Sequence, residues 1–188
     1  MSQFEYVAVL VSIIVGLALT QILRGVGGIV TTKDGPRPYW VHLVWTMFFF
    51  HYISTFWWWE FQLDSAEWSL GLYGVVIVYA TLLFFVSLIL HPSNLDGIQS
   101  YKEYYYLNRR WLFGLLIALQ LWDYVDTLIK GVDHMFELGF QFQFNHLGVI
   151  AASIIAMFTA NERFHKINAV VWMISIWSGT IWSFNIIS

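Results

Sequence analysis

Long apolar stretches alternate with short polar links along the whole chain. A helix that crosses a bilayer needs about 20 mainly apolar residues. Stretches of about that length predict six membrane-spanning helices, at residues 4–30, 39–60, 69–90, 111–129, 142–160 and 167–187. All three prolines fall in the links, so no predicted span is interrupted. The expected fold class is an all-α integral membrane protein, with residues 1–188 forming a single transmembrane domain of six helices.

Two links carry features of their own. Residues 64–68 (DSAEW) form a short acidic connection after the second predicted helix. Residues 101–110 (YKEYYYLNRR) combine tyrosines with basic side chains, a composition typical of segments at the membrane surface. We therefore expect 101–110 to lie along the interface before the chain enters the fourth helix.

Composition supports a membrane location. The chain is 59% hydrophobic and only 11% charged, with a mean hydropathy of +0.63, whereas about 25% of a soluble domain is charged. Aromatic residues make up 20%, and Trp and Tyr favour the membrane–water boundary. The absence of cysteine excludes disulfides and thiolate metal sites. A net charge of −3 gives no excess of positive charge that would bind nucleic acid. The expected partner is therefore the lipid bilayer and no nucleic acid.

The basic residues predict how the chain is threaded. Eight of the nine fall at the same ends of the predicted spans: Arg24, Lys33, Arg37, Lys102, Arg109, Arg110, Arg163 and Lys166. Only Lys130 falls at the opposite ends. Because Lys and Arg concentrate on the cytoplasmic side, we expect a multi-pass protein of the cell membrane with both termini outside the cytoplasm.

Small residues recur every four positions on several predicted helices. Ser12, Gly16, Thr20, Arg24 and Gly28 share one face of the first helix. Such faces let membrane helices approach closely, within a subunit or between subunits. Since so small a protomer would form a pore most easily by assembly, we expect a homo-oligomer.

Several segments resemble a group of multi-pass bacterial membrane proteins that have no assigned activity. These segments are SIIVGLALTQILRG (12–25), YWVHLVW (39–45), WWWEF (57–61), YYYLNRRWLFGLL (104–116) and NERFHKI (161–167). The resemblance implies six spans and a bacterial membrane, and it transfers no catalytic residue.

Polar side chains inside the predicted spans are the candidate site. Each ionisable group near the bilayer centre costs at least about 2.5 kcal/mol and usually faces a partner or a watery cavity. The candidates all fall in the outer half of the bundle: Glu5, His51, Gln120, Asp123, Asp126 and His146. They would form a proton or cation path, or an oxygen and nitrogen metal site. Alternatively, Asp126 reaches the headgroups, while Asp123 and His51 satisfy one another or a neighbouring side chain.

No cofactor is predicted from these residues; a haem or a metal ion is the alternative. His51 with His146, or His42 with His165, are the pairs that could hold a haem between facing helices. No helix carries two histidines at the spacing of stacked haems, and there is no HExxH or other zinc signature.

A second group of polar residues gathers at the cytoplasmic ends of the predicted helices. It comprises Arg24, His42, Arg109, Arg110 and His165. These residues would anchor the bundle through local ion pairs, or bind an anionic lipid or a nucleotide-like ligand. The sequence has no Gly-rich phosphate loop to support a nucleotide.

The favoured function is an oligomeric channel or transport component with a polar path through the outer half of the bundle. The alternative is a non-enzymatic sensor, scaffold or membrane-disrupting effector. A third possibility is an intramembrane redox or lipid-modifying enzyme, for which the sequence offers no catalytic residue.

Overall fold

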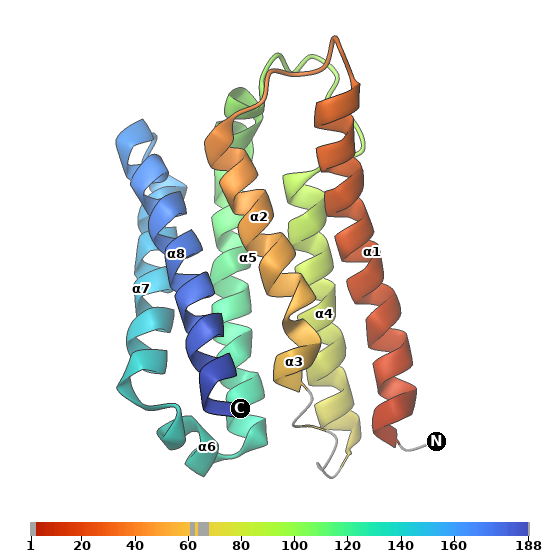
Figure 1. Cartoon of the computed structure of the whole chain (residues 1–188), viewed down its shortest axis with the longest axis vertical. Helices are drawn as coiled ribbons and strands as arrows, with labels where there is room; N and C mark the ends of the chain where they lie inside the picture. The colour runs from red at the N-terminus through yellow and green to blue at the C-terminus, as the bar shows by residue number, and fades with distance from the viewer. Residues whose placement is uncertain (1–2, 61–62, 64–67, 188) are drawn as a thin grey trace.

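The computed structural model describes residues 3–60, 63 and 68–187, with the backbone alone at 134, 137, 141 and 182–187. Within these residues the protein is built from helices and has no strand (Figure 1). The long helices are α1 (Gln3–Thr31), α2 (Trp40–Ser54), α4 (Leu70–Leu90), α5 (Tyr101–Lys130), α7 (Gly139–Phe158) and α8 (Glu162–Ile187). Two short helices, α3 (Phe56–Glu60) and α6 (Val132–Glu137), follow α2 and α5. The all-α class is confirmed, and the acidic positions of the 64–68 link lie outside the described residues.

Three of the described helices, α1, α4 and α5, are long and apolar enough to cross a membrane. Residues 142–158 of α7 form a shorter apolar helix. The chain therefore has the character of a membrane protein, and six complete spans remain a prediction.

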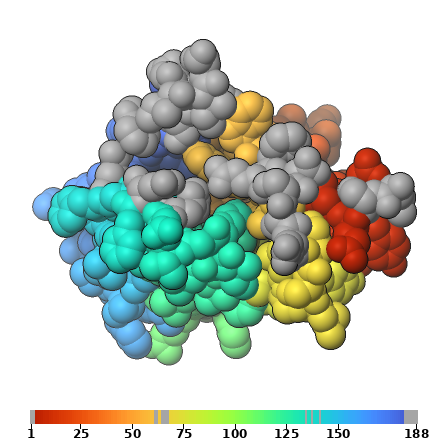
Figure 2. All heavy atoms as spheres, turned by 90° about the horizontal axis from the view of Figure 1, so that it is seen from below, coloured from red at the N-terminus to blue at the C-terminus, as the bar shows by residue number. Residues whose placement is uncertain are grey.

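The long helices form two rows. In the larger row α1 packs on α4, α4 on α5, and α5 on α7; in the smaller row α2 packs on α8. α2 also contacts α1 and α4, and α8 also contacts α7, so the second row covers the first. Viewed from the end that holds the N-terminus, α1 lies at one edge of the molecule and α7 near the other (Figure 2). The site described below lies where α2, α4, α5 and α7 meet.

Two predicted elements have different boundaries in the structure. Residues 101–110 do not lie as a separate interfacial segment; they are the first third of α5, which starts where the Ser100 hydroxyl accepts a hydrogen bond from the Glu103 amide at 3.2 Å. The predicted helix 39–60 is interrupted at Thr55. The Ser54 and Thr55 hydroxyls donate to carbonyls three and four residues earlier, a pattern that competes with the helical ladder.

The small-residue face of α1 does not pack within the chain. Its members, Ser12 through Gly28, are all exposed, and the buried face of α1 consists of larger apolar side chains. The larger side chains of this face provide more van der Waals contact with the neighbouring helices than glycine or serine would. On α7 one small residue does lie against a neighbouring helix: a Cβ on Gly148 would lie 3.1 Å from the Trp172 ring of α8.

One end of the bundle collects the eight basic residues, because α1, α4 and α7 end there and α2, α5 and α8 begin there (Figure 1). Two links at this end are tied by backbone bonds: the Arg37 amide donates to the Gln99 carbonyl at 3.0 Å, and the Tyr101 amide donates to the Arg37 carbonyl at 2.9 Å. We call it the basic end; the opposite end holds the N-terminus, α3 and α6.

Candidate functional site

Asp123 of α5 faces His146 of α7. The carboxylate oxygen Oδ2 lies 2.6 Å from the imidazole Nε2, and the two side chains are 23% and 13% exposed. Both residues were predicted to belong to one polar cluster, and the packing of α7 on α5 brings them together. The cluster therefore contains a carboxylate–imidazole pair within a largely apolar bundle.

The contacts of this pair fix how many protons it holds. His146 Nδ1 lies 3.0 Å from the Phe142 carbonyl, which can only accept, so Nδ1 carries a hydrogen and donates it. A contact of 2.6 Å between Nε2 and Oδ2 requires a further proton between these two atoms. The pair is thus either a carboxylate with an imidazolium or a carboxylic acid with a neutral imidazole, and its net charge is zero in both forms.

Two tyrosines extend the pair towards α2. The Tyr79 hydroxyl donates to Asp123 Oδ1 at 2.7 Å, and it lies 2.7 Å from the Tyr52 hydroxyl. Since the only hydroxyl hydrogen of Tyr79 points at Asp123, Tyr52 must donate to Tyr79. An unbroken chain of hydrogen bonds thus runs from Tyr52 through Tyr79 and Asp123 to His146, across four helices.

A second charged group lies at the C-terminal end of α5, away from the basic end. Lys130 Nζ is 2.6 Å from Asp126 Oδ2 and 3.2 Å from Glu60 Oε2, and it also donates to the Trp59 carbonyl at 3.4 Å. The two carboxylates are 3% and 2% exposed. With all three groups ionised the cluster has a net charge of −1. Asp126 is therefore buried beside a lysine.

The remaining predicted members of the outer cluster lie apart from this chain of hydrogen bonds. His51 Nε2 lies 2.9 Å from the Thr180 hydroxyl, and its ring stacks on Trp177 at 4.3 Å, so it joins α2 to α8. Gln120 is buried one turn below Asp123, and no hydrogen bond within the described part of the chain links the two. Glu5 is exposed in the first turn of α1.

At the basic end, the predicted cluster separates into two buried histidine sites. In one, the Thr46 hydroxyl donates to the His42 carbonyl at 2.9 Å, and His91 Nε2 lies 3.1 Å from that hydroxyl. Burial lowers the pKa of the His91 imidazole to about 4, so the ring is neutral at pH 7. The Thr46 hydrogen is already donated, which makes His91 Nε2 the donor to the Thr46 oxygen.

The second site is His165, which is fully buried at the start of α8. Its Nε2 donates to the Thr159 carbonyl at 3.1 Å, and its Nδ1 lies 2.9 Å from the Tyr105 hydroxyl of α5. Arg109 donates to the Tyr106 carbonyl at 2.5 Å, whereas Arg110 is exposed and lies 6.0 Å from the Phe158 ring centre. The His165–Tyr105 contact joins α5 to α8, whereas Arg109 bonds within α5 and Arg110 lies against α7.

The metal and haem interpretations gain no support from this geometry. Among the described residues, no group of three or more His, Asp or Glu is arranged to hold a metal ion. In each histidine pair that could hold a haem, the two side chains contact different partners. His51 contacts Thr180, and His146 contacts Asp123. His42 packs against His91, and His165 against Tyr105.

Sequence reasoning missed several members of the site. Lys130 stands four residues after Asp126, a spacing that places the two side chains on one helical face and could have identified the pair. Tyr52 and Tyr79 gave no such signal, because a single tyrosine in an apolar helix is equally at home in a core or at an interface.

The fold and the site define an all-helical chain with membrane-spanning character and a hydrogen-bonded polar core. Compared with known protein families, with curated proteins and with solved structures, the chain matches none of them.

Proposed function

We propose that this protein is a membrane-embedded transport component that conducts protons through the outer half of its bundle. The observation that carries the proposal is the chain of hydrogen bonds from Tyr52 through Tyr79 and Asp123 to His146. Linked O–H and N–H groups allow a proton to be accepted at one end and another to be released at the other. Proton pumps and transporters use such rows of carboxylates and histidines inside the membrane.

The Asp123–His146 pair would be the site on the path that binds and releases the proton. Its neutral form holds one shared proton; removing that proton leaves a negative charge in an apolar bundle, and adding one leaves a positive charge. Both charged forms are costly there, so the pair would release a proton as it receives the next. The tyrosines supply the hydroxyl groups through which that exchange would pass.

The cluster of Glu60, Asp126 and Lys130 would form the outer mouth of the path. With both carboxylates ionised around one ammonium group, the cluster would carry an excess negative charge, which attracts protons and other cations and repels anions. Asp126 stands one turn from Asp123 on the same helix, so the mouth and the pair are about 4.5 Å apart along the axis.

The pairing of Asp123 also favours the second candidate, a non-enzymatic sensor or scaffold. Asp123 accepts from Tyr79 and shares a proton with His146, as expected if polar groups are satisfied purely to hold the helices in place. A measurement of proton flux separates the two functions, because a scaffold conducts nothing.

The experiment compares variants in liposomes loaded with a pH-sensitive dye, with a potassium diffusion potential as the driving force. Asp123→Asn, His146→Gln and Tyr79→Phe should each reduce proton entry by about tenfold or more, the effect of about 1.4 kcal/mol on one step. Two control variants are used. Tyr73→Phe removes a hydroxyl from α4, the helix of Tyr79, that lies outside the hydrogen-bonded chain. Asp133→Asn removes an exposed carboxylate at the outer end. Both controls should conduct like the unmodified protein. Absence of flux in the unmodified protein, or equal flux in all variants, would reject the proposal.

We also propose where the protein lies in the cell and that it assembles into a complex. The protein would span the cell membrane with its basic end in the cytoplasm, both termini outside, and several copies in one complex. The gathering of eight basic residues at one end supports this orientation. Protease digestion of a terminal tag in intact spheroplasts tests the orientation, and the mass of the detergent-solubilised complex tests the assembly.

A further inference from the structure

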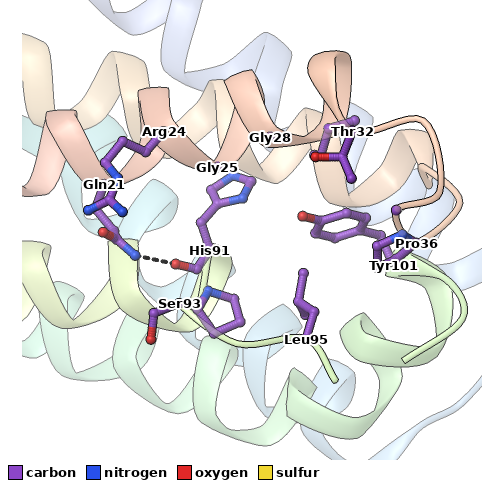
Figure 3. Close-up of a pocket in the computed structure, with 13 residues that line it drawn as sticks. Gln21, Arg24, Gly25, Gly28, Thr32, Pro36, His91, Ser93, Leu95 and Tyr101 are labelled. Atoms are coloured by element: carbon purple, nitrogen blue, oxygen red, sulfur yellow. Dashed lines mark hydrogen bonds between the residues drawn. The ribbon is translucent and has the colours of Figure 1, made fainter. Parts of the chain in front are cut away.

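A cavity of about 230 Å³ opens at the basic end, away from the proton path (Figure 3). Its walls are the last turns of α1, the turn at residues 35–36, the segment 91–95 and the side chain of Tyr101. The Gln21 amide of α1 donates to the His91 carbonyl, which joins two of these walls.

Glycines on α1 create this space. A Cβ on Gly25 would lie 2.1 Å from the His91 ring, so only glycine allows that ring to lie against α1. A Cβ on Gly28 would meet nothing within 4 Å, and Gly28 lines the cavity. Gly25 therefore allows the His91 ring to pack against α1, and Gly28 leaves open space beside that ring.

The cavity offers a positive charge and a hydrogen-bond donor. Arg24 lines it, no Asp or Glu does, and Arg24 forms no ion pair with any carboxylate in the described part of the chain. Tyr101 is 5% exposed, its hydroxyl points into the cavity, and that hydroxyl has no hydrogen-bond partner among the described residues. Both side chains line one cavity. Figure 3 shows the Arg24 guanidinium beside Gln21, so this flexible side chain would turn toward Tyr101 to reach the same ligand. A guanidinium and a buried phenol on one cavity favour an anion with oxygen acceptors.

We propose that this cavity binds the phosphate group of an anionic lipid, through Arg24 and Tyr101. Basic pockets between membrane helices at the cytoplasmic side bind such headgroups. The surface beside the cavity suits the acyl chains, because α1 exposes Leu23 and Val30, at 58% and 79%. A soluble phosphate ester would use the same two donors, so the experiment must separate the two sources.

Bound lipid is measured by native mass spectrometry of the purified full chain in a neutral detergent. Phosphatidylglycerol, phosphatidylcholine and glycerol phosphate are added in separate titrations. Arg24→Gln should weaken phosphatidylglycerol binding by about tenfold or more, since a hydrogen bond to a charged group contributes about 1.5–3 kcal/mol. Gly28→Leu should also weaken it, because the added side chain would occupy the cavity that Gly28 lines. Gly27→Leu is the matched control, because Gly27 also has open space around it and does not line the cavity.

Each result decides the assignment. Preferential retention of phosphatidylglycerol that is lost in Arg24→Gln and Gly28→Leu, and kept in Gly27→Leu, supports it. Equal retention of phosphatidylcholine, equal binding by all variants, or binding of glycerol phosphate without lipid would overturn it. Intrinsic tryptophan fluorescence on heating shows that each variant is folded, and Tyr101→Phe provides a second reduced-affinity variant that keeps the shape of the side chain.

Discussion

The Asp123 carboxylate and the His146 imidazole join α5 to α7 through a contact of 2.6 Å between Oδ2 and Nε2. His146 is fixed on its other side by the Phe142 carbonyl of its own helix, and Asp123 by the Tyr79 hydroxyl of α4. The pair consequently sets the register of two helices that pack along much of their length. It stabilises the bundle whether or not a proton moves through it.

A double-mutant cycle measures this contribution. Asp123→Ala and His146→Ala should each destabilise the protein, and the double variant should lose less than the sum by about 1–3 kcal/mol, as residues in direct contact do. Unfolding by SDS in mixed micelles, followed by tryptophan fluorescence, gives the free energies. Asp133→Ala with His146→Ala should be additive within about 0.5 kcal/mol, because Asp133 lies outside the network. Additivity in the first cycle would show that the pair contributes no coupling.

Lys130 holds two buried carboxylates together, so its loss should be severe. Lys130→Met keeps most of the side-chain volume but leaves Glu60 and Asp126 buried without their shared cation. Breaking a buried ion pair in this way costs about 3–5 kcal/mol. The same mixed-micelle unfolding measures the loss.

A second substitution tests the cause. Glu60→Gln removes one of the two negative charges, so the Lys130→Met, Glu60→Gln double variant should recover part of the lost stability. If the double variant is less stable than Lys130→Met alone, repulsion between the two carboxylates is not the reason for the loss.

The apolar pattern predicted the helices well because burial and bilayer thickness act on whole stretches of chain. It missed the interruption at Thr55 and the joining of residues 101–110 to α5, because both depend on local hydrogen bonds of hydroxyl groups. A Ser or Thr can cap, bend or simply continue a helix, and its choice follows from neighbours that a periodicity does not contain.

The sequence predicted how deep each polar side chain of the site lies along its helix. It did not predict which of these side chains contact one another. Rise per residue places Asp123 and His146 at related depths, and the structure brings them together. The same reasoning placed His51 with them, although its imidazole lies on the α2–α8 contact. Depth fixes one coordinate of a side chain, whereas the direction it faces depends on how the helices are rotated and which of them are neighbours. Sequence order does not give the neighbours: α1 packs mainly on α4 and less on α2, the next long helix in the chain.

Gly25 should be the least tolerant glycine of α1. An added Cβ would lie 2.1–2.4 Å from atoms of the His91 side chain, which cannot retreat without losing the Nε2 contact with Thr46. Overpacking of this kind typically costs about 1–3 kcal/mol. Gly25→Ala should therefore lower the melting temperature in detergent, whereas Gly27→Ala, with open space around it, should leave it equal or slightly higher. Equal melting temperatures for the two variants would contradict the close approach of His91 to α1.

At the surface of the basic end, Glu162 connects the starts of α5 and α8. Its Oε2 accepts from Lys102 at 2.6 Å and its Oε1 from Lys166 at 2.9 Å. These hydrogen bonds, from Lys102 first and Lys166 second, lower the pKa of the Glu162 carboxyl from 4.5 to about 2. A folded-state pKa below the unfolded one means that the pairing stabilises the protein above about pH 4.5, and that this stabilisation is lost as the pH falls through 2.

Titration of the Glu162 carboxyl carbon by NMR, with selectively labelled protein in micelles, should show a midpoint well below that of an ordinary glutamate. Lys102→Gln removes the stronger of the two donors and should move the midpoint upward, and Lys166→Gln should move it upward by less. Because the three side chains are 39–47% exposed, added salt should shrink both shifts. A midpoint that is unchanged by either substitution would show that the two lysines do not hold the carboxylate in solution.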